Sequence, residues 1–307
     1  MPYSKVKEEI TMTKKSYSQG LLHIFFILAS LTCLLPVILV IGVSFSDENT
    51  IVANGFKFIP EKVSFEAYNF LWNQSSQIAT AYGVSIFVTV VGTLLSLLLI
   101  ALYAYPLSRK ELKHRNKFAL FIFLTMIFNG GLVPWYLVYV NFLHLKDSVW
   151  ALILPLLLQP FFVIIMRTFF QTTIPDSIVE SATIDGASEV KIFYKIILPL
   201  SLPVLATIGL FNTLNYWNDW FLSLLYITKS NGISLQYLMY KTLLNIQYLT
   251  TNENAASQLS KMGEVINLPS RSLQMAMAVV GIGPIVLAYP FFQKYFVKGL
   301  TIGAVKG

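Results

Sequence analysis

The sequence is poor in charge, in cysteine and in the motifs of catalytic or nucleotide-binding sites. Only 12% of its 307 residues are charged, whereas 55% are hydrophobic. The single cysteine, Cys33, excludes an intrachain disulfide. The sequence has no Gly-x-x-x-x-Gly-Lys-Ser/Thr phosphate loop, no paired carboxylates, no metal-ligand cluster and no nucleophile beside a base. We therefore expect a non-catalytic protein that binds no cofactor of its own.

The hydrophobic residues gather in six long runs. The mean hydropathy of +0.64 lies well above that of globular proteins. A helix rises about 1.5 Å per residue, so about 20 apolar residues cross a hydrocarbon core about 30 Å thick. The runs cover residues 21–43, 81–107, 118–140, 149–166, 196–227 and 273–293. These lengths predict an all-α membrane protein with six transmembrane helices, because barrel strands are much shorter.

The lysines and arginines predict the orientation. With the N-terminus inside, 15 of the 22 fall in the inner segments and 7 in the outer ones. Both termini are therefore expected in the cytoplasm. Basic inner loops also account for the net charge of +7, so no nucleic-acid partner is needed. We expect the first run to remain as a membrane anchor, because it is too long for a signal-peptide core and no small-residue cleavage site follows it.

The third run is interrupted in its middle. Asn129, Gly130 and Gly131 break it, and Pro134 breaks it again. Irregular backbone at membrane depth is tolerated only where protein or a water-filled cavity satisfies its polar groups. Such interruptions point to a translocation path, which makes Asn129 a candidate path residue. A kink that merely improves helix packing is an equally open interpretation.

The fifth run carries prolines near its inner end and a polar, aromatic stretch farther out. Pro199 and Pro203 predict a kink. Amides beside aromatic rings suit a sugar, which offers hydroxyls at its edges and C–H groups on its faces. The candidate path residues here are Asn212, Asn215, Tyr216, Trp217, Asn218 and Asp219. An outer aromatic belt that includes Trp217 and Trp220 is the alternative.

Between the fourth and fifth runs lies a charged segment that must be outside the bilayer. Ser177 and Glu180 have the spacing of a capping box, which predicts that a short helix begins near Ser177. Gly186 should end this helix, and a second one should start near Ser188. Asp185 falls at the negative end of the first helix, so we expect a cation or a helix N-terminus to offset its charge.

This segment resembles the EAA loop of ABC-importer permeases, in which Glu-Ala-Ala is followed after three residues by Gly and after nine more by Ile-x-Leu-Pro. The matching residues are Glu180, Ala182, Gly186, Ile196, Leu198 and Pro199, while Ser181 replaces the usual Ala. The resemblance implies the type I ABC-importer permease fold, with this loop docked into a cleft of a cytoplasmic ATPase. The implied coupling residues are Glu180, Ser181, Ala182, Asp185, Gly186 and Ala187.

Three further stretches are similar to the carbohydrate-importer branch of these permeases, as in the maltose transporter. They are Asn129–Leu132, the Trp217–Asn218 pair, and the tail from Lys298 through Val305, Lys306 and Gly307. The similarity implies a second, different permease subunit, two ATPase subunits that bind ATP and magnesium, an extracellular sugar-binding protein and membrane lipid as partners. It also implies that Leu235, Leu238 and Met239, in an amphipathic outer loop, contact the binding protein.

The expected division of the chain follows from these observations. Residues 1–20 form a cytoplasmic segment, 21–80 the first transmembrane helix and an outer segment, 81–297 the permease core with the coupling loop at 175–195, and 298–307 a cytoplasmic tail. An ion-coupled secondary transporter is an alternative, but only Asp219 and His23 come near to supplying the ionisable group that it needs in the membrane. An ABC importer for a non-sugar solute is another.

Overall fold

A computed structural model describes residues 3–251 and 270–304, and these fall into two compact units. Unit 1 comprises residues 1–73 and 246–280, and unit 2 comprises residues 74–245 and 281–307. The part of the chain that the structure describes is helical, and its only extended pairing is a single bridge between Ser46 and Val63. The predicted all-α fold class is therefore confirmed.

Unit 1 contains the first long helix and the outer segment that follows it. Its helices are α1 (Tyr3–Ser44), α2 (Glu48–Asn54), α3 (Glu66–Asn73), the end of α14 (Leu235–Thr251) and the start of α16 (Ser270–Ala304). The Glu48 carboxylate accepts hydrogen bonds from the backbone N–H groups of Arg271 and Ser272, each at 3.1 Å. Because the first N–H groups of a helix have no partner inside it, this carboxylate ties α2 to the start of α16.

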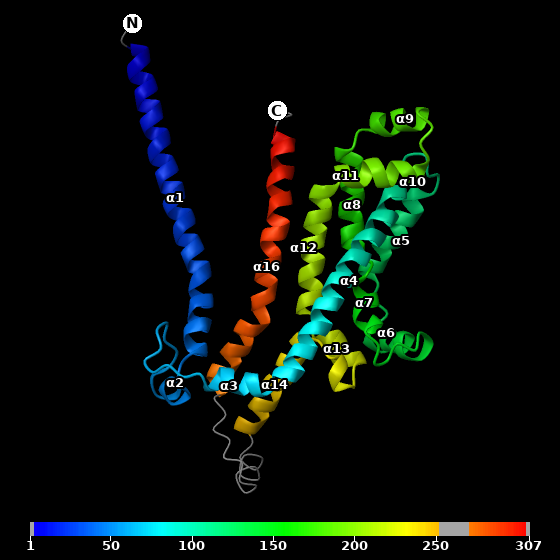
Figure 1. Cartoon of the computed structure of the whole chain (residues 1–307). Helices are drawn as coiled ribbons and strands as arrows, with labels where there is room; N and C mark the ends of the chain where they lie inside the picture. Colours follow the sequence, from blue (N-terminus) through cyan, green and yellow to red (C-terminus); the bar gives the residue numbers. More distant parts are fainter. Residues whose placement is uncertain (1–2, 252–269, 305–307) are drawn as a thin grey trace. The chain divides into compact units, whose positions relative to one another are not determined.

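Unit 2 contains the remaining helices. They are α4 (Ser75–Ser108), α5 (Arg115–Ile127), α6 (Leu132–Leu137) with η1 (Val138–Phe142), α7 (Trp150–Ile153) with η2 (Leu154–Leu156), α8 (Pro160–Thr173), α9 (Asp176–Ile184), α10 (Glu189–Ile192) with η3 (Phe193–Ile197), α11 (Leu198–Leu200), α12 (Leu202–Asn218), α13 (Phe221–Tyr226), η4 (Ser230–Gly232), the start of α14 and the end of α16. Helices α9 and α10 lie at one end of this unit, and α6, α7 and α13 lie at the other (Figure 1).

Helix α4 is the centre of unit 2, with α12 and α8 packed along it (Figure 1). A small residue permits the close contact with α12. A Cβ atom added to Gly92 would lie 2.6 Å from the Tyr216 ring, so any larger residue would push the two helices apart. The Tyr216 hydroxyl continues past α4 and donates to the Ile153 carbonyl at 3.0 Å. That carbonyl needs a partner because α7 passes into a 3₁₀ turn containing Pro155.

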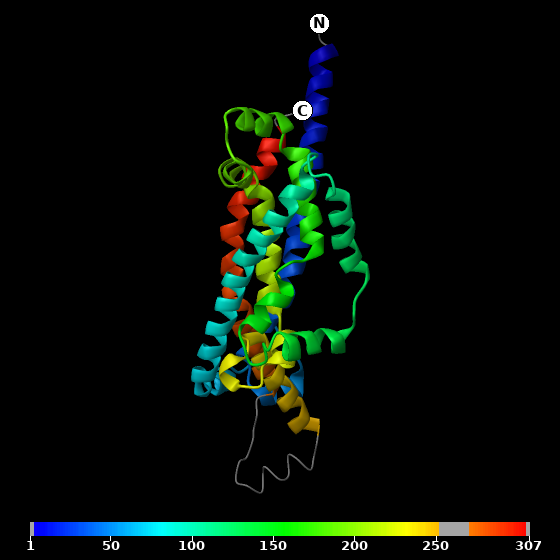
Figure 2. The same ribbon diagram turned by 90° about the vertical axis from the view of Figure 1, so that its right-hand side faces the viewer.

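Three of the six predicted spans are continuous and three are broken. Residues 19–44, 75–108 and 270–294 form helices long and apolar enough to cross a membrane. The other candidates are bent pairs: 115–127 with 132–142 at 113°, 150–156 with 160–173 at 50°, and 189–200 with 202–218 at 78°. Figure 2 shows the sharp turn from α5 into α6. The interruption predicted at Asn129–Gly131 is therefore confirmed, but the turn is too sharp for one straight helix.

The fifth span differs most from its prediction. A bend of 78° separates the segment 189–200 from α12, and α12 ends at Asn218 instead of continuing to residue 227. Pro199 and Pro203 each lack an N–H, so the helix cannot keep its backbone hydrogen bonds on either side of Ser201. The Ser201 hydroxyl donates to the Ile197 carbonyl at 2.6 Å, which satisfies one group at the bend.

Candidate functional site

The candidate coupling loop consists of α9, a turn at Gly186, and α10. Gly186 has φ +78°, a conformation that side chains with a Cβ rarely adopt, and the Ala187 N–H donates to the Ala182 carbonyl across the turn at 3.0 Å. Ser188 then begins α10, where its side chain accepts from the Lys191 N–H at 3.4 Å. The predicted end at Gly186 and the predicted start near Ser188 are confirmed.

The short helix predicted to begin near Ser177 is present and begins at Asp176, but the predicted capping box is wrong. Pro175 occupies the position before α9, no side chain caps the helix, and Ser177 lies within its first turn. Pro175 takes the N-cap position in place of Ser177, so α9 starts at Asp176 and not at Ile178, where a capping box would start it. In the described part of the chain, no ion pair reaches Asp185, so the expected offsetting cation does not come from these residues.

Helix α9 turns a mixed surface outward. Val179 and Ala182 are buried beneath it, whereas Glu180, Ser181 and Asp185 are exposed. Ile184 is 86% exposed, the largest exposed fraction among the large hydrophobic residues described. The Ser181 hydroxyl donates to the Ser177 carbonyl at 2.8 Å, so the change from Ala at this position leaves no unpaired group. A short helix that exposes the apolar side chains of Ile178 and Ile184 beside acidic ones has the character of a docking surface.

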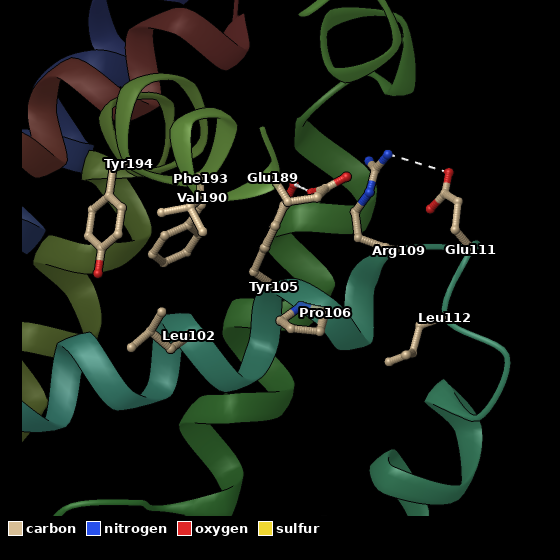
Figure 3. Close-up of a pocket in the computed structure, with 10 residues that line it drawn as sticks. All are labelled: Leu102, Tyr105, Pro106, Arg109, Glu111, Leu112, Glu189, Val190, Phe193 and Tyr194. Carbon is tan, nitrogen blue, oxygen red and sulfur yellow. Dashed lines mark hydrogen bonds and ion pairs between the residues drawn. The ribbon is translucent and has the colours of Figure 1, made fainter. Parts of the chain in front are cut away.

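Hydrogen bonds and ion pairs fasten the loop to the end of α4 (Figure 3). The Tyr105 hydroxyl, on α4, donates to the Glu189 carboxylate, on α10, at 2.7 Å. Lys110 and Arg109 follow α4 and pair with Asp176 at 2.8 and 3.8 Å. The Lys110 ammonium holds the pKa of the Asp176 carboxyl below its ordinary value, chiefly through their hydrogen bond. These contacts connect α9 and α10 to the long helix α4.

A cavity of about 440 Å³ lies between α4 and α10. Its walls are mostly apolar, and Figure 3 shows the Arg109 guanidinium and the carboxylates of Glu111 and Glu189 along one side. The acidic groups neighbouring Arg109 leave little net positive potential for an anion.

Two of the candidate path residues, Asn212 and Tyr216, are structural. Asn212 is fully buried and donates to the Ser96 hydroxyl at 2.9 Å, and that hydroxyl donates to the Leu157 carbonyl at 2.7 Å. The Leu157 carbonyl follows a 3₁₀ turn and precedes α8, so it has no helical partner. Through these bonds Asn212 and Tyr216 support the broken fourth span, while the buried Asn212 Oδ1 atom has no hydrogen-bond partner among the described residues.

Trp217 is also buried, and its indole N–H donates to the Gly281 carbonyl of α16 at 3.1 Å. Asp219 accepts from the Leu222 N–H at 3.0 Å and so caps α13. Asn129 is exposed and accepts from the Gly131 N–H at 2.9 Å, which forms the turn between α5 and α6. These contacts give all three residues a local structural role.

Asn215 and Asn218, by contrast, are exposed. The Asn215 amide donates to the Gln159 side chain at 3.3 Å, across the break between η2 and α8. Phe161 follows Gln159 by two residues, Phe211 precedes Asn215 by about one turn of α12, and the two rings are 56% and 51% exposed. We call Gln159, Phe161, Phe211, Asn215 and Asn218 the amide–aromatic face. Its members combine hydrogen-bonding amides with aromatic rings, which is the chemistry that a sugar requires.

The predicted binding-protein contacts are largely internal. Leu235 and Leu238 are 0% and 3% exposed and belong to the apolar core of unit 2, with Met239 packed against that core. The Leu235 N–H donates to the Ser85 hydroxyl of α4 at 2.8 Å. The amphipathic helix predicted here is present as α14, but its apolar face serves packing. Leu244 and Tyr248 are its exposed large hydrophobic residues.

Sequence reasoning missed Gln159, Phe161, Phe211 and Ile184. Gln159 is the only polar residue in the apolar run from Val149 to Met166, and it stands directly before Pro160 at a helix break. A lone amide at such a break could have been identified from the sequence of the fourth run as a candidate site residue. The tail residues Val305, Lys306 and Gly307 lie outside the described residues.

Comparison with known proteins agrees with this geometry. The family model described as "Binding-protein-dependent transport system inner membrane component" matches residues 117–302, which run from the first turn of α5 through α14 and include most of α16. The polygalacturonan/rhamnogalacturonan transport system permease protein YtcP of Bacillus subtilis is 41% identical over 94% of this chain and 97% of its own length. Protein LplC of the same organism is 38% identical over 89% of this chain and 90% of its own.

A solved structure shares the fold. A chain from a bacterial ABC transporter involved in the import of the acidic polysaccharide alginate superposes with a TM-score of 0.75 at 30% identity, over 90% of this chain and 96% of that one. The apolar helices and these relatives place the protein in the plasma membrane as a multi-pass component. Such components work with a substrate-binding protein and the other parts of an ABC transporter. The chain therefore belongs to the family of binding-protein-dependent transport system inner membrane components.

Proposed function

We propose that the chain is a permease subunit of an ABC importer for oligosaccharides. The single observation that carries this proposal is the construction of α9, which exposes Glu180, Ile184 and Asp185 while α10 is bonded to α4. A non-catalytic subunit has to receive its energy through such a surface. The descriptions of YtcP and of the alginate importer both name a polysaccharide, which supports a carbohydrate substrate for this chain.

The proposed energy source is a pair of cytoplasmic ATPase subunits, which bind ATP and magnesium. Each would receive the α9 surface of one permease subunit, with Ile184 in an apolar part of its cleft. Glu180 and Asp185 have no ion-pair partner in the described residues, so the matching cleft should be basic. This assignment places the coupling loop, both termini and the 298–307 tail on the cytoplasmic side.

The proposed substrate surface is the amide–aromatic face. A sugar ring would stack on Phe211 or Phe161 and take hydrogen bonds from Asn215, Asn218 and Gln159. Four of the five residues of this face are exposed in the described chain and Gln159 is partly buried, so a second, homologous permease subunit would have to enclose the other side of the path. A heterodimer with two different walls suits an asymmetric, directional substrate.

The mechanism would be alternating access. Closure of the ATPase pair moves α9 and α10, and the Tyr105–Glu189 hydrogen bond passes this motion to α4. Because α12 and α8 pack along α4, the amide–aromatic face then moves as part of a rigid group. An extracellular sugar-binding protein would deliver the solute to the outward-facing form.

The test is ATPase stimulation in proteoliposomes that contain both permeases, the ATPase pair and the binding protein. Oligogalacturonates and neutral oligosaccharides of matched length are added separately. We expect at least one class to raise ATP hydrolysis and to accumulate inside, and omission of the binding protein to abolish both effects. Stimulation by amino acids or ions, with none by any oligosaccharide, would contradict the proposed substrate class.

A further inference from the structure

The loop that follows α2 in unit 1 carries a cluster of exposed apolar side chains. Phe56, Phe58, Ile59, Val63 and Phe65 are 53%, 49%, 81%, 59% and 58% exposed. They occur within ten residues, outside the predicted spans, where exposed large hydrophobic residues normally indicate a contact surface. We call residues 56–65 the apolar loop.

The apolar loop is fixed to the end of α1. A Cβ atom added to Gly42 would lie 2.2 Å from the Phe58 carbonyl oxygen, so the loop backbone touches the last turn of α1 directly. The Ser64 N–H donates to the Phe45 carbonyl at 2.8 Å, and the Asp47 N–H donates to the Lys62 carbonyl at 3.0 Å. Figure 1 shows this loop beside the C-terminal end of α1. The loop therefore cannot leave the level at which α1 ends.

That level is the membrane interface. The apolar part of α1, Gln19–Ser44, has 26 residues. At about 1.5 Å per residue it is about 39 Å long, which exceeds a hydrocarbon core of about 30 Å by about three residues at each end. Gly42 is two residues from the end of α1, so it lies at the edge of the hydrocarbon. Phe58, which touches it, is held at the same depth.

The charges around the apolar loop are neutralised in pairs. Lys57 forms an ion pair with Glu61, and Lys62 pairs with Asp47 at 3.0 Å. These contacts hold the pKa of both carboxyl groups below their ordinary values, so each pair stays intact at neutral pH. Paired charges cost less to bring close to lipid than single ones. A mixed surface of this kind is typical of segments that lie in the interface.

We propose that the apolar loop is a lipid contact, with Phe58 and Ile59 inserted between the headgroups of the leaflet in which α1 ends. The contact continues the exposed apolar surface of α1, whose 18-residue apolar window has no buried residue within the described chain, whereas Val43 and Ser44 at its end are buried. It would fix the height of α1 in the bilayer and hold α2, whose Glu48 organises the start of α16. The occupant of the loop surface is thus lipid and not a protein partner.

The test uses nitroxide labels on the complete importer in liposomes. Cys33 is exposed in α1, so it is first replaced by Ser, and Ile59→Cys is then labelled in that background. Asn69→Cys is the matched control, since Asn69 is an exposed polar residue on α3 of the same unit. We expect the Ile59 label to collide more with oxygen, which dissolves in lipid, than with a water-soluble nickel chelate, and the Asn69 label to show the reverse.

Equal access of both labels to the nickel chelate would overturn the proposal. So would an Ile59 label that is shielded from both reagents, since that result indicates a protein contact. The measurement is then repeated with the loaded binding protein present. An Ile59 label that becomes shielded only when this protein is added would show that the loop contacts the binding protein. None of these readouts depends on transport, so they stand apart from the proposed substrate.

Discussion

The polar residues of α9 and those of α12 meet opposite environments. On α9, Glu180 and Asp185 are exposed and no ion pair reaches them within the described chain. On α12, Asn212 and Tyr216 are fully or almost fully buried, and each donates a hydrogen bond to another helix or to a freed carbonyl. Polar groups in an apolar protein thus have two uses. Those with internal partners hold the helices together, and those left exposed are available to a ligand or a second protein.

Asn215 shows that both uses occur on a single helix. It lies three residues after Asn212 and has the same side chain, yet it is exposed, as is Phe211 about one turn earlier on α12. Residue type alone therefore cannot separate a scaffold amide from a binding amide. The burial of each side chain makes the distinction.

The largest effect is expected from Gly186→Leu, which changes the exposed surface at the end of α9. A left-handed conformation costs a Leu residue about 1–2 kcal/mol, and the added side chain would project from the surface proposed to enter the ATPase cleft. No other atom lies within 4 Å of a Cβ at this position, so the helices themselves have room for it. We expect normal membrane insertion and loss of transport in an uptake assay.

Gly186→Asn is the control for this variant. Asn tolerates the same backbone conformation and is smaller, so it should keep much of the transport. Normal uptake by the Gly186→Leu variant would remove α9 as the docking surface.

The second prediction compares the loss of the buried amide, Asn212, with the loss of the exposed amide, Asn215. Asn212→Ala removes a buried hydrogen bond and opens a small void, at a cost of about 1–3 kcal/mol, so the melting temperature in detergent should fall. Asn215→Ala should leave the melting temperature nearly unchanged, because its side chain is exposed. It should reduce oligosaccharide-stimulated ATP hydrolysis while basal hydrolysis persists.

A reversed pattern, with Asn215→Ala unstable and Asn212→Ala defective only in stimulation, would show that burial does not distinguish structural amides from amides of the substrate path. Gln159→Ala sharpens the test, since Gln159 is the hydrogen-bond partner of Asn215. It should resemble Asn215→Ala.

Tyr105→Phe tests the connection between the two regions. The change removes only the hydroxyl that donates to Glu189 and keeps the ring that packs against Phe170 and Phe193. A hydrogen bond to a carboxylate contributes about 1.5–3 kcal/mol, less here because Glu189 is exposed. We expect more ATP to be hydrolysed per molecule of sugar imported. Tyr103→Phe, two residues earlier on α4, should leave this ratio unchanged.

The smallest effect concerns acid stability at the opposite end of unit 2. Asp147 accepts hydrogen bonds from the backbone of Thr228 and Lys229, and the Thr228 N–H is the main cause that lowers the pKa of its carboxyl. The pKa of Asp147 in the folded protein is below the unfolded value of about 3.9. The contribution of Asp147 to the free energy of unfolding is therefore full above about pH 4 and is lost as the pH falls through the folded pKa.

Asp147→Asn should therefore lower the melting temperature near neutral pH, and its difference from the unmodified protein should shrink as the pH falls below about 4. Circular dichroism melts in detergent measure this difference. A difference that stays constant with pH would mean that the charge of Asp147 has no part in the contact.

Much of the fold could be predicted from the sequence because the apolar runs are long and the breaks are marked by Gly and Pro. The interruption at Asn129–Gly131 and the kink near Pro199 are examples. The 78° size of that kink could not be predicted, since it depends on two prolines four residues apart acting together with the packing of α12 on α4.

The candidate site was predicted less evenly. The coupling loop is read from charges that cannot lie in hydrocarbon, so its position follows from composition and spacing. The faces of α12 could not be assigned, because Phe211 and Ile208 are equally apolar, yet the first is 51% exposed and the second is fully buried. In a membrane helix, apolar side chains face both lipid and protein, so hydrophobicity does not identify the buried face.

The most direct test of the central claim, that α9 is where a partner ATPase delivers its energy, is a cross-link from Ile184. A Cys33→Ser, Ile184→Cys variant is assembled into the full importer and treated with a short thiol–amine cross-linker. Asn231→Cys is the control, since Asn231 is exposed in η4, which follows α13 at the opposite end of unit 2. We predict that the Ile184 variant cross-links to the ATPase subunit, with a yield that changes when ATP is bound, and that the Asn231 variant does not. Cross-linking of Asn231 and not of Ile184 to the ATPase would contradict the account.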